Sequence, residues 1–189
     1  DQNNKTNKIN HEYSGIAASV DCNNRWVSLD PLRGSIAAVA ESARNVSCVG
    51  ALPVAITNNL NFASPETEIG YWQLHTACEG ISIACEALET PVTGGNVSLY
   101  NESIDDEGNK KPIHPTPVIG MVGVLDNVKQ AVSSEWKNIN DEIWIIGSKD
   151  SGLTLGATSY LEYFHGQITG RPPSLNLIDE KLCQLFIRN

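Results

Sequence analysis

Residues 29–66 read LDPLRGSIAAVAESARNVSCVGALPVAITNNLNFASPE, and this stretch decides the fold class. After Asp30-Pro31, apolar residues recur at the three- and four-residue spacing of a helix, and Gly50 supplies a stop signal. A short apolar run at 53–56 then predicts a buried strand. The stretch therefore predicts a helix that is followed directly by a strand. The apolar helix positions are Ile36, Val39, Ala40, Ala43 and Val46.

Upstream of this stretch the pattern predicts a β-hairpin. Apolar and small or polar residues alternate over 16–20, which predicts a strand, and a second short run at 26–29 predicts its partner. Residues 1–12 are polar apart from Ile9, so they cannot bury enough surface to offset the entropy of ordering. We expect these twelve residues to form a flexible arm.

Downstream, the pattern predicts one long helix and two strands. Pro65-Glu66 suits a first helical turn, and Pro91 ends the apolar periodicity of that helix. A strand is expected from Val92, broken by the pair Gly94-Gly95, and a clear strand at 118–124 follows. With the upstream elements, these segments make one α/β unit spanning residues 13–127.

Residues 128–189 predict the opening of a second domain. EIWIIG at 142–147 has the composition of a strand, 160–165 is a helical segment, and 176–187 is an amphipathic helix. One strand and two helices do not close a core by themselves. We therefore expect a truncated carboxyl-terminal domain here.

Charge and hydropathy exclude two classes of partner. The chain has 189 residues, with 13 Lys and Arg against 22 Asp and Glu, and its formal net charge is −9. Such a balance argues against a surface that neutralises nucleic-acid phosphates. No apolar run approaches the roughly 18 residues of a membrane span, and the polar N-terminal stretch is unlike a signal peptide. We expect a cytoplasmic protein with neither nucleic acid nor membrane as partner.

The segment TGGNVS at 93–98 is the strongest candidate for chemistry. Its two glycines would let a phosphate approach backbone N–H groups, and its amide and hydroxyl could bind oxygen ligands or Mg²⁺. The same composition is also typical of a tight turn, which remains an alternative. The polar run 57–59 is expected just after the strand at 53–56, where α/β proteins present ligand-binding groups, although it could equally cap the loop or the next helix.

Other polar clusters carry weaker signals. The acidic run 105–107 lacks the spacing of a calcium loop and predicts a solvated hairpin. His75 has no second histidine at zinc-ligand spacing, and no serine or cysteine stands in a nucleophile-elbow context. We therefore assign no catalytic residue to this chain.

Four long strings together resemble one enzyme family. They are LDPLRGSIAAVAESARNVSCVGALPVAITNNLNFASPE at 29–66, TPVTGGNVSLYNES at 90–103, IHPTPVIGMVGVLDN at 113–127 and HGQITGRPPSLNL at 165–177. In this order they are similar to the synthetase subunit of phosphoribosylformylglycinamidine synthase, also called formylglycinamide ribonucleotide amidotransferase. The resemblance covers the third domain of that family and the beginning of the fourth, which implies a longer parent polypeptide.

The resemblance implies a fold and a reaction. The expected fold is α/β (α+β), an amino-terminal-type domain like that of aminoimidazole ribonucleotide synthetase, with a mixed sheet and flanking helices. In the family, ATP phosphorylates the amide oxygen of formylglycinamide ribonucleotide, and ammonia displaces phosphate to form the amidine in purine biosynthesis. The implied cofactors are ATP and Mg²⁺. The implied partners are the first half of the synthetase, a glutaminase subunit or domain and a small bridging subunit.

Four site residues follow from the resemblance. Asn96 falls at the family's magnesium-ligand position, Gly95 at an ATP contact and Ser98 at a contact to formylglycinamide ribonucleotide. Asn58 stands where the family often has an ATP-contacting aspartate, so the hydrogen bonding is kept and the negative charge is lost.

The resemblance also places essential groups outside this chain. The catalytic histidines, the ATP-contacting lysine and most acidic magnesium ligands belong to the family's first half. We therefore expect this chain to contribute one wall of a ligase site and to be inactive alone. The alternatives are a non-catalytic nucleotide-binding or assembly module, or another member of the superfamily such as aminoimidazole ribonucleotide synthetase or selenophosphate synthetase.

Overall fold

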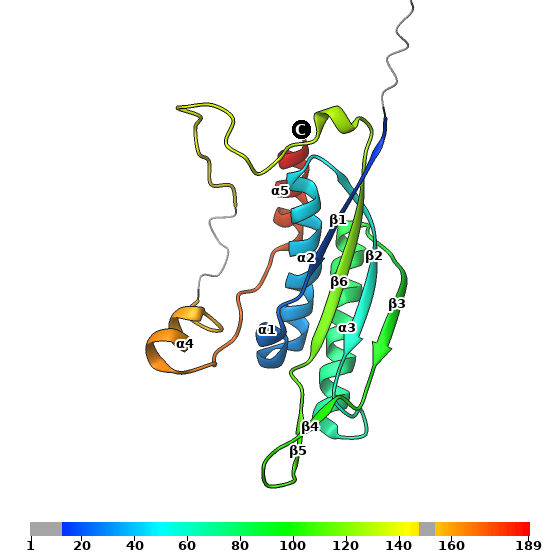
Figure 1. The fold of residues 1–189 in the computed structure, drawn as a ribbon, viewed down its shortest axis with the longest axis vertical. Coiled ribbons are helices and arrows are strands. Elements are labelled where there is room, and N and C mark those ends of the chain that lie inside the picture. The colour runs from blue at the N-terminus through cyan, green and yellow to red at the C-terminus, as the bar shows by residue number, and fades with distance from the viewer. Residues whose placement is uncertain (1–12, 148–153) are drawn as a thin grey trace, which may run out of the picture.

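A computed structural model describes residues 13–147 and 154–189, so the expected arm at 1–12 lies outside the described residues. A four-stranded sheet has two long helices together on one side (Figure 1). The elements are β1 (Gly15–Asp21), α1 (Asn24–Leu29), α2 (Pro31–Cys48), β2 (Leu52–Asn61), α3 (Glu68–Leu88), β3 (Val92–Ser98), β4 (Glu102–Ile104), β5 (Lys110–Pro112), β6 (Thr116–Leu125), the 3-10 helix η1 (Val128–Gln130), α4 (Ser159–His165) and α5 (Leu177–Arg188).

The main sheet is mixed, in the order β1-β6-β2-β3. β6 runs antiparallel to both β1 and β2, whereas β2 and β3 are parallel and are connected through α3. This architecture confirms the predicted α/β class with a mixed sheet and helices packed against it. β4 and β5 form a separate hairpin, and the acidic run 105–107 lies in its exposed turn, as predicted.

The core lies between one face of the sheet and helices α2 and α3. Ile56 of β2 and Ile119 and Met121 of β6 are fully buried there. α2 approaches closely because its buried face is rich in alanine, and because Gly123 of β6 has no side chain; a Cβ atom there would lie 2.2 Å from Val46. Dense packing of this kind makes the helix side of the sheet intolerant of added volume.

The start of α2 follows the sequence prediction closely. Asp30 is the N-cap, and its Oδ1 accepts a hydrogen bond from the backbone N–H of Arg33 at 3.1 Å. Pro31 occupies the first helical turn, where its missing N–H costs nothing. Gly50, with φ of 88°, follows the end of the helix and turns the chain into β2.

Residues 26–29 are helical, so the predicted hairpin is wrong. They belong to α1, whose N-cap Asn23 accepts a hydrogen bond from the backbone N–H of Trp26 at 3.2 Å. β1 pairs instead with β6. A four-residue apolar run is too short to separate a strand from one turn of helix, and here the asparagine cap favours the helix.

Three further boundaries differ from the prediction. Residues 92–98 form one strand, because both glycines pair with β2 despite their low strand propensity; the register shifts once, at Thr93, just before them. α3 begins at Glu68 with Thr67 as its N-cap, rather than at 65–66. Residues 142–147 are not a strand, because no described strand lies beside them to complete a ladder.

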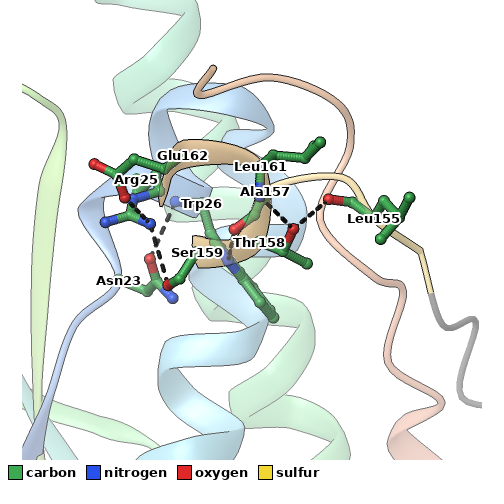
Figure 2. A network of polar contacts seen from close by, with 9 residues as sticks. All are labelled: Asn23, Arg25, Trp26, Leu155, Ala157, Thr158, Ser159, Leu161 and Glu162. Atoms are coloured by element: carbon green, nitrogen blue, oxygen red, sulfur yellow. Dashed lines mark hydrogen bonds and ion pairs between the residues drawn. The ribbon is translucent and has the colours of Figure 1, made fainter. Parts of the chain in front are cut away.

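The carboxyl-terminal elements return to the amino-terminal unit. α5 packs along α2 and contacts α3, and the Arg44 guanidinium forms two 2.9 Å hydrogen bonds with the Glu180 carboxylate. α4 lies beside α1 (Figure 2). There Trp26 Nε1 donates to Ala157 O at 3.2 Å, and Arg25 forms a 2.7 Å ion pair with Glu162. None of the described helices has both the length and the apolar character needed to cross a bilayer.

We predict that Trp26→Phe loosens the α4 segment without unfolding the sheet. The substitution keeps an aromatic ring but removes the hydrogen bond to Ala157, which is worth about 1 kcal/mol. Hydrogen exchange should therefore speed up in α4 about fivefold while β6 is unchanged. Equal acceleration in both elements would contradict this local role.

Candidate functional site

All four predicted site residues lie on the neighbouring parallel strands β2 and β3. Asn58 is opposite Gly95, Asn59 is opposite Asn96, and Asn61 is opposite Ser98. The polar run 57–59 was predicted to follow the strand, and this prediction is wrong: the run lies within β2. β2 continues to Asn61 because β6 pairs with its backbone on one side and β3 on the other.

The strand alternation divides these residues between the two faces of the sheet. Asn58 lies between Ile56 and Leu60, whose side chains pack in the core on the helix side. Asn59 and Asn96 are an opposed pair and therefore share the other face, and so do Asn61 and Ser98. The predicted magnesium and substrate positions therefore lie on the open face, whereas the Asn58 side chain is turned toward α3.

The two glycines have different roles. A Cβ atom at Gly95 would lie 2.1 Å from Asn58 Oδ1 and 2.7 Å from the Asn58 carbonyl oxygen, so this position accepts only glycine without a shift of the backbone. A Cβ atom at Gly94 would meet nothing within 4 Å. The tight-turn alternative is wrong, because both residues are in β3 and neither has a positive φ.

On the helix side, Asn58 borders a hollow of about 570 Å³ between α3 and the β2–β3 edge. Cys78 and Cys85 of α3 line the same hollow, and burial raises the pKa of both thiols. These thiols stay protonated at neutral pH, because the shift moves them further from the thiolate form. The hollow therefore offers two neutral thiols beside Asn58, and Glu86 and Glu89 add carboxyl groups to its lining.

On the open face, Asn96 is held through its amide nitrogen. Asn96 Nδ2 donates a 3.2 Å hydrogen bond to Asn59 Oδ1. Within the part of the chain that the structure describes, no donor reaches Asn96 Oδ1. Asn96, Asn59 and Gly120 border a shallow hollow of about 390 Å³ on this face. The amide oxygen is thus available to a ligand.

Ser98 is held by Asn101, which the sequence analysis did not single out. Asn101 Nδ2 donates to the Ser98 carbonyl at 2.8 Å and to the Phe62 carbonyl at 3.2 Å, and its Oδ1 is 3.2 Å from Ser98 Oγ. Between them Tyr100 has φ of 61°, a left-handed conformation that is unusual for a non-glycine residue. These contacts fix the turn after β3 and with it the serine hydroxyl.

The rest of the open face is apolar. Ile16 and Val20 of β1 are 80% and 71% exposed, and Val122 and Val124 of β6 point the same way. One half of the face is therefore an exposed aliphatic surface, and the other half carries the amides and hydroxyl of β2 and β3. Contiguous apolar surface of this kind marks an interface in a folded protein.

These residues fit a magnesium ion only as a single ligand. Among residues 13–147 and 154–189, no group of three or more His, Cys, Asp or Glu residues is placed to hold a metal. The unpaired Asn96 oxygen is a suitable neutral ligand, but a divalent ion requires further carboxylate or phosphate oxygens. The described residues could therefore supply only one side of such an ion, and its other ligands would have to come from outside them.

Comparison with known proteins places the chain in a family. Residues 5–125 match the family model described as AIR synthase related protein, N-terminal domain. This chain belongs to the AIR synthase-related family. The AIR synthase-related match includes β1 to β6 and therefore both strands of the candidate site.

Individual relatives agree with this membership. The chain is 74% identical over 177 residues to phosphoribosylformylglycinamidine synthase subunit PurL of Prochlorococcus marinus strain MIT 9312, which covers 94% of this chain and 23% of the relative. Thermotoga maritima PurL complexed with ATP matches with a TM-score of 0.58 and 32% identity, covering 68% of this chain and 20% of that one. The same protein complexed with FGAR matches with a TM-score of 0.57 and 33% identity, and the match again covers 68% of this chain and 20% of that one. The resemblance to phosphoribosylformylglycinamidine synthase is confirmed, and the chain spans about a quarter of the length of the P. marinus relative.

Proposed function

We propose that this chain forms one wall of the active site of an ATP-dependent carbon–nitrogen ligase, which converts formylglycinamide ribonucleotide to formylglycinamidine ribonucleotide. The main support is the placement of Asn96 and Ser98 on one open face of a parallel strand pair. The 74% identity to a PurL subunit supports the same activity.

Each site residue has a distinct task in this proposal. The Asn96 oxygen binds Mg²⁺, which neutralises phosphate charge when bound. The Ser98 hydroxyl, fixed by Asn101, hydrogen-bonds formylglycinamide ribonucleotide. Asn58 and Gly95 are the proposed ATP contacts. The Asn58 amide replaces a carboxylate, so it contributes hydrogen bonding without adding negative charge, and the missing side chain of Gly95 leaves room for that amide.

The open face supports the proposed partners. Its apolar half, which includes Ile16 and Val20, would be covered by the first half of the synthetase, and that segment would also supply the catalytic histidines and acidic magnesium ligands. A glutaminase subunit or domain, with a small bridging subunit, would supply ammonia to the same assembly. We propose the cytoplasm as its location, which remains a prediction from the sequence.

A non-catalytic nucleotide-binding or assembly module is the second candidate. The described residues hold no acidic metal cluster, and Asn58 is neutral, which favours a binding role over turnover. The two candidates differ in what they predict for a reconstituted assembly, because only the ligase should form product.

The decisive experiment titrates the chain with ATP and Mg²⁺, first alone and then with the separately expressed first half of the synthetase. We expect heat of binding and amidine formation only in the mixture. Asn96→Ala in the mixture should lower turnover at limiting Mg²⁺ by at least about tenfold. This is the lower end of the range of activity losses seen when a group that supports a metal site is removed.

The matched control is Asn109→Ala, which removes an exposed amide from the β4–β5 turn, away from the site. It should leave turnover unchanged. Tight nucleotide binding by the chain alone, with no product in the mixture, would favour the binding module instead.

A further inference from the structure

Three asparagines on the open face form a continuous chain of hydrogen bonds. It begins at Asn61, whose Nδ2 lies 3.2 Å from the Asn59 carbonyl oxygen and 3.5 Å from the Thr116 carbonyl oxygen. Backbone carbonyls only accept hydrogen bonds, so the amino end of the Asn61 carboxamide must face them. Its orientation is therefore set by the backbone of β2 and β6.

The second member transmits this orientation. Asn59 Oδ1 accepts from Asn61 Nδ2 at 3.3 Å and from Asn96 Nδ2 at 3.2 Å. Asn61 presents an N–H group whose direction the backbone has fixed, so the oxygen of Asn59 must lie toward it and the amino group of Asn59 away from it. A flipped Asn59 would place N–H groups against N–H groups and lose both bonds.

The third member is the proposed cation ligand. Because Asn96 gives its amino end to Asn59, its Oδ1 points away from that bond. A carboxamide without such a partner would present nitrogen and oxygen alternately to the ligand, and the N–H dipole repels a cation. The pairing of Asn59 opposite Asn96 in adjacent strands fixes the distance between the two side chains.

We propose that Asn61 and Asn59 are positioning residues, which orient Asn96 so that its oxygen faces a divalent cation. This inference rests on the proposed role of Asn96 and adds two residues that do not touch the cation. Supporting groups of this kind, one shell behind a ligand, tune metal affinity about 10- to 100-fold.

The test uses the complete synthetase assembly and Mn²⁺ as a spectroscopic probe for Mg²⁺. Mn²⁺ binding is followed by electron paramagnetic resonance in the presence of a non-hydrolysable ATP analogue. Asn59→Leu keeps the size of the side chain and removes the acceptor, and it should weaken Mn²⁺ binding about 10- to 100-fold. Asn59→Asp keeps the accepting oxygens and should restore binding to within about threefold of the parent.

Thermal unfolding separates orientation from folding. We expect Asn59→Leu and Asn59→Asp to unfold within about 2 °C of the parent, because the backbone ladder between β2 and β3 is untouched. Asn59→Ala is measured beside them as a smaller replacement that fits without repacking, and it should show the same loss of Mn²⁺ affinity as Asn59→Leu.

The outcomes are distinguishable. If Asn96→Ala leaves Mn²⁺ binding intact, the proposed role of Asn96 fails and the positioning role fails with it. If Asn96→Ala weakens binding but Asn59→Leu and Asn59→Ala do not, only the positioning role is overturned. If all Asn59 variants unfold early and Asn59→Asp does not restore binding, the residue is structural and the inference is also overturned.

Discussion

Gly95→Ala is expected to lower the free energy of unfolding by about 3 kcal/mol, near the upper end of the costs measured when an extra methyl group is forced into a packed site. Gly94→Ala should not destabilise the protein. The added methyl group at 95 would lie 2.1 Å from Asn58 Oδ1 and 2.7 Å from the Asn58 backbone oxygen. A side-chain amide can rotate away, but the backbone oxygen belongs to the β2–β3 ladder. Strand β3 must therefore shift. Chemical denaturation of the two single variants measures the difference.

Gly94→Ala is a stringent control, because it makes the same chemical change one residue earlier in the same strand. Its methyl group would meet nothing within 4 Å, and replacing a strand glycine should leave stability equal or higher by up to about 1 kcal/mol. Adding Asn58→Ala to Gly95→Ala removes the closer contact only, so it should rescue part of the loss. Equal stability of the two single variants would show that β3 has room at both positions.

Glu180→Ala is the second substitution with a large expected effect. It leaves the Arg44 guanidinium without its two 2.9 Å hydrogen bonds, and it also removes the bond from Gln184 Nε2 to Glu180 Oε1. A guanidinium does not lose its proton near neutral pH, so Arg44 stays charged in the variant and has lost its partner. We expect a loss of about 2 kcal/mol, less than for a fully buried pair, because the Arg44 side chain is 38% exposed.

The comparison for this prediction is Glu162→Ala. That substitution breaks the ion pair between α1 and α4, in which the side chains of Arg25 and Glu162 are 32% and 42% exposed. Pairs this exposed contribute less than about 1 kcal/mol. Urea unfolding of both variants gives the ranking, and a larger loss for Glu162→Ala would place the main anchor of the carboxyl-terminal elements at α4 instead of α5.

Elements with strong local signals could be predicted from the sequence. α2 combines a capping aspartate, a proline in its first turn, helical periodicity and a glycine after its end, and all four signals agree. Residues 26–29 lack such agreement, because one turn of helix and a short strand have the same apolar pattern. Residues 142–147 have strand composition, but a strand also needs a neighbour, which composition does not encode.

The candidate site could be predicted only in part for the same reason. Asn58, Gly95, Asn96 and Ser98 do meet, since adjacent parallel strands bring them together. The sequence did not predict that these residues divide between two faces. The strand was expected to end at residue 56, so the alternation of side chains between the two faces was not applied to residues 57–61. The roles of Asn59, Asn61 and Asn101 depend on which carbonyls face each amide, and that arrangement arises only from tertiary structure.

The segment at 139–146 has a practical consequence for work at the bench. Ile139, Trp144 and Ile145 are 93%, 77% and 99% exposed, and the four residues 143–146 form a run of high β-propensity without any charge. Such a run is a template for cross-chain pairing, so solubility should fall steeply as the protein is concentrated. The protein should therefore be handled in dilute solution. Co-expression with a partner that covers this segment should allow milligram amounts to stay in solution.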